Sequence, residues 1–365
     1  MPTTAALPER IHKMPRILPG REGVDSSMPL YTLRIGSAIV FFGATAASSV
    51  LFALTLQTPS SFLFLILAAS LTVFLRLAVH SPWVYLAALP ALIAGFLTGG
   101  AFTAAASLLW LPLAAAISIC ILRGQNKKQV TLVSVFTLLA AACLWFAIWF
   151  AFSYGSLSPA LLRDTFSGWY DRLRATMFPS ASIDLLYEYL APSLNGSLSL
   201  DAFRAQMSAL ADAFFLSLKM MTPAIIGLLA ILSSYLSVSL AALWIKIMNC
   251  PLLIPCRPFT VNVSPIAASV YVLAYFASSA ASLAEETRIA LGINNVVLLF
   301  MPAMLLMGGK CLLRLAKNPL RRRIFLLSAL FLLLFLWNGL SWYLVSLLGV
   351  VDCFRSAYRN KVNRS

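Results

Sequence analysis

Apolar residues dominate nine stretches of the chain, each long enough or nearly long enough to cross a bilayer as a helix. A hydrocarbon core of about 30 Å needs about 20 apolar residues in a helix. Spanning β-strands would instead show short alternating segments. The pattern therefore predicts an all-α fold, a polytopic transmembrane helical bundle of about eight or nine spans. The stretches are residues 35 to 56, 61 to 79, 82 to 98, 100 to 122, 129 to 153, 220 to 245, 265 to 283, 291 to 313 and 324 to 350.

Composition points to the same class. Hydrophobic residues make up 61% of the chain and charged residues only 11%, and the mean hydropathy is +0.88. These values exceed what the core of a soluble domain needs. The formal net charge of +15 favours contact with anionic lipid over nucleic acid, whose readers carry a coherent basic face. The lipid bilayer is therefore the expected partner, and we expect no nucleic acid.

Basic residues gather in alternate gaps between the stretches, which predicts the orientation of the chain. Retention of Lys and Arg in cytoplasmic loops predicts a multi-pass protein of the cell membrane with its N-terminus in the cytoplasm. Nine crossings would put the basic tail with Arg355 outside, against the rule. Either that tail is an exception or the last stretch, which contains Asn338 and Gly339, is re-entrant. We favour one long tilted helix, because tilt readily absorbs extra length.

The same pattern divides the chain into segments. A proline-rich N-terminal tail precedes the first stretch and reads as disordered, and either Met1 or Met28 could be its start. One long loop, translocated in this orientation, separates the fifth and sixth stretches. The segments are a disordered cytoplasmic tail (1–34), N-terminal membrane helices (35–153), an outer amphipathic loop (154–219), C-terminal membrane helices (220–351) and a basic tail (352–365).

The outer loop carries two amphipathic patterns. After Ser158, apolar residues recur three or four positions apart up to Met177, and a second such series follows Ser199 into the sixth stretch. Helices of this kind could lie on the membrane surface, with Trp169 and Tyr170 at headgroup level. They could also cap a vestibule, and we favour simple surface packing.

Residues and motifs typical of catalytic or metal-binding sites are scarce. The chain has two histidines and six cysteines, and the cysteine spacings do not match a zinc site. No phosphate-binding loop, nucleophile elbow or zinc-protease motif is present. We therefore expect no enzyme activity, no cofactor and no metal.

Five polar residues near span ends are candidates for ligand binding, because such groups are costly at membrane depth. Asn294 and Asn295 could hold a polar ligand or bond one helix to another, and we favour the helix-to-helix bond. Lys219 could face an anionic ligand or reach the headgroups, and we favour the headgroups. Glu285 and Glu286 could bind a cation, but an exposed turn is the simpler interpretation.

Small residues four apart predict close helix packing. Gly43 and Ala47 form such a pair in the first stretch, and Gly95 and Gly99 form another in the third. Such faces serve either internal packing or the docking of a partner membrane subunit. We favour internal packing in a protein with this many spans.

Several short motifs occur in an order typical of one family. They are Leu89-Pro90-Ala91-Leu92 with Gly95 and Gly99, the loop Arg123 to Lys128, Pro223, Pro258-Phe259 with Pro265, Asn295 followed by Gly308, and the ending Leu348 to Arg355 that contains Asp352. Over residues 35 to 356 the chain resembles the YybS-like family of uncharacterised bacterial integral membrane proteins. The long N-terminal tail and the long outer loop depart from that family.

The resemblance carries an expectation about function. The layout of the YybS-like family is similar to the substrate-binding subunits of energy-coupling-factor vitamin transporters, which bind a small molecule and dock on a partner through small residues of the first helix. This implies a small-molecule capture or transport subunit whose ligand is unknown. The alternative is a non-catalytic membrane scaffold for envelope proteins, which would need no set of residues arranged for chemistry.

Overall fold

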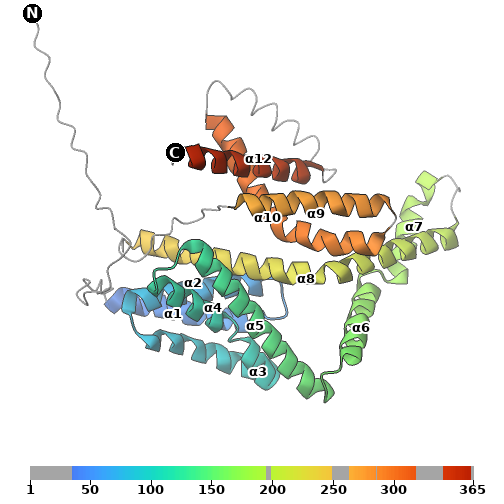
Figure 1. Cartoon of the computed structure of the whole chain (residues 1–365). Coiled ribbons are helices and arrows are strands. Elements are labelled where there is room, and N and C mark those ends of the chain that lie inside the picture. The colour runs from blue at the N-terminus through green and yellow to red at the C-terminus, as the bar shows by residue number, and fades with distance from the viewer. Residues whose placement is uncertain (1–34, 195–198, 249–262, 285, 318–339, 363–365) are drawn as a thin grey trace, which may run out of the picture. The chain divides into compact units, whose positions relative to one another are not determined.

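The computed structural model describes residues 35–194, 199–248, 263–284, 286–317 and 340–362. Over these residues the chain forms helices joined by turns and contains no β-strand, so the predicted all-α fold is confirmed (Figure 1). The helices are α1 (Ile35–Leu54), α2 (Ser61–Val79), η1 (Pro82–Ala88), α3 (Leu89–Ala106), α4 (Trp110–Leu122), α5 (Lys127–Tyr154), α6 (Pro159–Met177), α7 (Ser180–Leu194), α8 (Leu200–Ile247), α9 (Pro265–Leu283), α10 (Thr287–Lys317) and α12 (Leu340–Val362).

Seven helical segments of the described chain are long and apolar enough to cross a membrane, which confirms a multi-pass membrane protein. They are Gly36–Leu54, Ser61–Val79, Pro82–Leu122, Lys127–Tyr154, Leu200–Ile247, Pro265–Leu283 and Arg288–Arg314. The ninth predicted stretch, 324 to 350, lies mostly outside the described residues.

The segment Pro82–Leu122 holds two of the predicted stretches, because the chain reverses at Gly99 and Gly100. Gly100 has a φ of +75°, which a residue with a side chain rarely adopts. Beyond the turn, the Ser107 hydroxyl donates a hydrogen bond of 3.1 Å to the carbonyl of Ala91. The predicted turn between the third and fourth stretches is therefore confirmed.

The two amphipathic helices predicted in the outer loop are also present. The hydroxyl of Ser158 accepts from the Leu161 backbone N–H at the start of α6, and Ser199 caps α8 in the same way. A further helix, α7, lies between them. The first turns of α8 continue directly into the sixth span as one helix, Leu200–Ile247. The helix therefore runs without a break through residue 219, where we predicted the boundary between the outer loop and the C-terminal membrane helices.

Two hydrophobic cores organise the helices. The larger core contains side chains from α1, α2, η1, α4, α5 and α8, and the smaller one contains side chains from α9, α10 and α12. Helix α8 packs on α2 and α5 of the first group and on α10 of the second. It is therefore the helix that connects the two cores.

Helices α10 and α12 cross at very short range. A Cβ atom added at Gly308 would overlap the carbonyl oxygen of Val345, and one added at Gly349 would overlap that of Met304. Close by, the hydroxyls of Tyr271 on α9 and Ser346 on α12 are hydrogen-bonded at 2.7 Å. Helix α12 extends to Val362, so residues from 352 onward that we expected to form a tail are helical in the described part.

Candidate functional site

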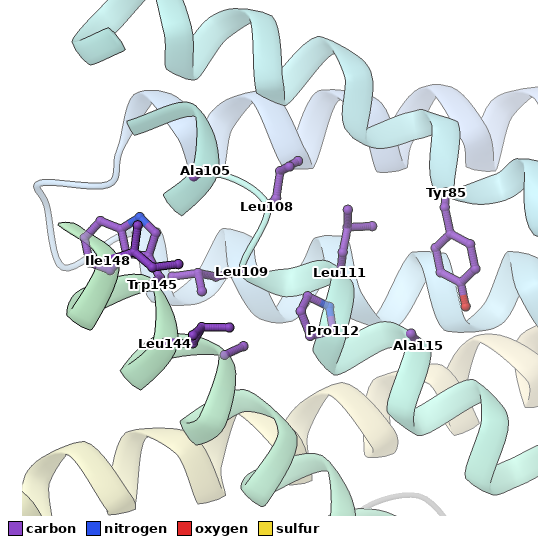
Figure 2. Close-up of a pocket in the computed structure, with 11 residues that line it drawn as sticks. Tyr85, Ala105, Leu108, Leu109, Leu111, Pro112, Ala115, Leu144, Trp145 and Ile148 are labelled. Carbon is purple, nitrogen blue, oxygen red and sulfur yellow. The ribbon is translucent and has the colours of Figure 1, made fainter. Parts of the chain in front are cut away.

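An apolar groove of about 520 Å³ lies between α4 and α5. Figure 2 shows Tyr85 of η1 at one end of the groove and Trp145 and Ile148 of α5 at the other. Its volume falls within the range of about 300–1,000 Å³ that is usual for small-molecule sites. The lining residues are Tyr85, Ala105, Leu108, Leu109, Leu111, Pro112, Ala115, Ala141, Leu144, Trp145 and Ile148.

Local sequence explains why a groove forms here. The helix α3 ends at Ala106 and α4 begins at Trp110, whose fully buried side chain anchors the new helix in the core. Pro112 lies in the first turn of α4, where its missing N–H costs no helical hydrogen bond. Ala115 on α4 and Ala141 on α5 are small, so the two helices leave space between them.

The groove offers hydrocarbon rather than hydrogen-bonding groups. Its two polar side chains are already engaged, because the Tyr85 hydroxyl is 3.3 Å from the Ser118 hydroxyl and the Trp145 indole N–H donates to the Phe102 carbonyl at 3.1 Å. At its edge, Leu144 is 63% exposed and Ile148 is 46% exposed. In a membrane protein this edge faces lipid, so the groove suits an apolar chain.

Two further hollows, of about 480 Å³ and 470 Å³, border the same break between α3 and α4. One shares Leu109 with the groove, and the other shares Ala105 and Leu108. Apart from Ser61 and Ser233, their lining residues are apolar. None of the ligand candidates that fall within the described residues lines any of these three hollows.

Asn294 lies between α9 and α10. The hydroxyl of Ser278 on α9 is 2.8 Å from the Asn294 Oδ1 and 3.2 Å from the carbonyl oxygen of Ala290, and it donates to both. Asn294 therefore joins two helices, and a ligand role for it stays a prediction.

Asn295 lies against α8 beside Pro223. Proline lacks an N–H and disturbs the carbonyls of the preceding turn, which a neighbouring helix can satisfy in a membrane protein. Here the Asn295 Nδ2 donates to the Met220 carbonyl at 3.0 Å. The Asn295 Oδ1 is buried and has no hydrogen-bond donor among the described residues. Asn295 thus bonds α10 to a carbonyl in the turn of α8 before Pro223, a partner that the sequence pattern did not specify.

Lys219 and Glu286 lie at the surface. The Lys219 ammonium donates to the Ser167 hydroxyl on α6 at 2.6 Å, and the next turn of α8 bonds to the same helix through Thr222 and Tyr170. Glu286 is exposed, and Glu285 lies outside the described residues. Lys219 and Met220, the residue whose carbonyl accepts from Asn295 of α10, are thus neighbours on α8.

The small-residue pairs behave differently from one another. A Cβ atom at Gly95 would lie 2.9 Å from the Ala104 Cα, so Gly95 allows the two limbs of the hairpin to touch. Gly99 forms part of the turn itself. Gly43 and Ala47 are exposed on α1, and a Cβ atom at Gly43 would meet no atom within 4 Å. This pair is therefore not covered by the described part of the chain, and both internal packing and partner docking stay predictions for it.

The two residues of the C-terminal motif have different surroundings. Asp352 is 3% exposed, and its carboxylate is 2.5 Å from the guanidinium of Arg314 on α10. Arg355, less than one turn further along α12, is exposed. Arg314 is the residue that sequence reasoning missed, because basic residues between the stretches were interpreted only as a sign of orientation.

In the described parts of the chain, no group of three or more His, Cys, Asp and Glu residues is placed to hold a metal ion. Comparison of the chain with models of known protein families, with curated proteins and with solved structures found no match.

Proposed function

We propose that the protein is a membrane subunit that captures a small amphiphilic molecule from the bilayer, with the molecule's hydrocarbon chain lying in the groove between α4 and α5. The observation that carries the proposal is an open apolar groove whose two polar side chains are already hydrogen-bonded. A water-soluble metabolite would need free polar groups to fix its orientation. An acyl or isoprenoid chain needs none, and it can enter sideways past the exposed edge of Leu144 and Ile148.

Filling the groove is expected to prevent capture. In the variant Ala141→Phe, the new ring occupies space between α4 and α5, so labelling of these helices by a photoactivatable fatty acid should fall several-fold. The measurement is mass spectrometry of labelled peptides from the protein in lipid nanodiscs. Ala140→Phe is the matched control, because Ala140 is the exposed neighbour on α5 and does not line the groove.

Two results would contradict this proposal. One is equal labelling of α4 and α5 in the Ala141→Phe and Ala140→Phe proteins. The other is labelling of the wild type that spreads evenly over all lipid-exposed helices, because that would be solvation by lipid and not capture. Thermal unfolding of both variants identifies any loss of labelling that comes from misfolding.

A membrane scaffold is the second candidate function, and the exposed face of α1 favours it. Gly43 and Ala47 leave the α1 backbone open to close approach by another membrane helix. Proximity labelling should then recover reproducible partner proteins, and Ala47→Leu should disperse them while Ala140→Leu on α5 should not. Recovery of the same partners from both variants would exclude this face as the docking surface.

A further inference from the structure

Helix α6 is amphipathic, and none of its residues is fully buried. One side is bonded to α8 through Ser167, Tyr170 and Arg174. The guanidinium of Arg174 lies 2.9 Å from the Ser208 hydroxyl and 3.0 Å from the Asp212 carboxylate, and Ser167 accepts from Lys219. These contacts fix the rotation of α6 about its own axis.

A different side of α6 is apolar. It contains Leu162, Phe166, Trp169, Leu173 and Met177, which recur at helical spacing. Its first half packs on the end of α5, where the ring of Phe146 lies 5.8 Å from that of Phe166 and 6.5 Å from that of Trp169. Its second half has no such cover, because Leu173 is 42% exposed and Met177 is 54% exposed.

The polar side of α6 is turned away from the apolar one. Asp164, Asp171 and Arg172 are exposed there, and helical geometry places Asp164 and Asp171 roughly opposite Leu173. Helix α6 follows α5 and packs on α8, both of which contain candidate spans, whereas α6 itself is not among the segments apolar enough to cross a membrane. Its mixed apolar and charged sides suit a helix that lies along the membrane surface.

We propose that α6 is an interfacial helix whose apolar side lies at the boundary between the headgroups and acyl chains of one leaflet. The occupant is lipid, because the apolar side of α6 packs on α5, a helix apolar enough to span the membrane, and stays exposed beyond that contact at Leu173 and Met177. This depth suits the indole ring of Trp169, since tryptophan is enriched at membrane interfaces. The proposal does not depend on the groove between α4 and α5.

A pair of reporter positions tests this proposal. Single cysteines at Met177→Cys and Asp171→Cys, in the full chain with its six native cysteines replaced, carry an environment-sensitive fluorophore. The protein is placed in nanodiscs of phosphatidylglycerol and phosphatidylethanolamine with a nitroxide near the headgroup. We expect several-fold stronger quenching by the nitroxide lipid at position 177 than at position 171, and the reverse order with iodide in the water.

Equal lipid quenching at the two positions would overturn the proposal. So would a fluorophore at position 177 that is shielded from both quenchers, because protein would then cover this side of α6. A second measurement uses the chain with its native cysteines, so it does not depend on the folding of these variants. Oxidation of Met177 by hydrogen peroxide should be slow in nanodiscs compared with a free methionine peptide, whereas oxidation at the peptide's rate would mean that the side chain faces water.

Discussion

Replacing Gly308 by alanine is expected to lower the free energy of unfolding by about 1–3 kcal/mol, the usual cost of overpacking a well-packed contact. The added methyl group would overlap the carbonyl oxygen of Val345, which is backbone and cannot rotate away. Helices α10 and α12 must therefore move apart. Separation would weaken the smaller hydrophobic core, in which Met304 of α10 and Val350 of α12 are buried. Thermal unfolding of the purified protein in detergent measures the effect.

Gly309→Ala is the matched control for this prediction. Gly309 is the next residue of the same helix, and a Cβ atom there would meet no atom within 4 Å. Alanine favours a helix over glycine by about 1 kcal/mol, so this variant should be at least as stable as the wild type. Gly349→Ala should reproduce the loss seen at Gly308, because its Cβ atom would overlap the Met304 carbonyl. Unfolding of Gly308→Ala at the wild-type temperature would disprove the tight crossing.

The crossing shows how far small-residue spacing predicts packing. The spacing correctly indicated a close contact at Gly95, where the partner limb follows directly in the sequence. Gly43 and Ala47 have the same spacing but are exposed in the described part of the chain. Gly308 and Gly349 were noted only as features of a family resemblance, although they form the tightest contact between α10 and α12. Spacing identifies a face that permits close approach, but the partner helix depends on the tertiary fold.

The bonds from helix to helix that we favoured for Asn294 and Asn295 are present, but their partners were not predicted. The cost of polar groups in a membrane correctly drew attention to Asn294 and Asn295. Their bonds to Ser278 and to the Met220 carbonyl depend on which helices are neighbours, and sequence alone does not give neighbours. Pro223 offered a signal that could have been used, because a proline in a span disturbs carbonyls that an adjacent amide can satisfy.

The groove between α4 and α5 had no signal of its own in the sequence. Its walls are leucine, alanine and aromatic residues, which are the same types that fill the cores and face the lipid. What creates it is the geometry of the break at 107–109 together with Ala115 and Ala141 on facing helices. Hydrophobic periodicity predicts that a helix exists, but it does not predict where two helices fail to touch.

Removing the guanidinium of Arg314 is expected to be more damaging than removing the carboxylate of Asp352. In Arg314→Leu, the buried Asp352 loses its partner at 2.5 Å, and an unpaired buried charge is costly. The reverse change costs less, because Arg314 is 56% exposed and its guanidinium remains solvated in Asp352→Leu. That exposure also reduces the value of the pair, so the loss in Arg314→Leu should be about 1–3 kcal/mol.

The double variant Arg314→Leu with Asp352→Leu decides whether the two groups act together. Replacing both members of a buried ion pair by apolar residues is often neutral or stabilising, so this protein should unfold at a higher temperature than Arg314→Leu alone. Arg355→Leu is the control, because Arg355 is exposed on the same helix, and it should unfold like the wild type. If the two single losses simply add in the double variant, Asp352 and Arg314 are not coupled. Coupling would mean that the Asp352 of the C-terminal motif holds α12 against α10, and that its neighbour Arg355 has no part in that contact.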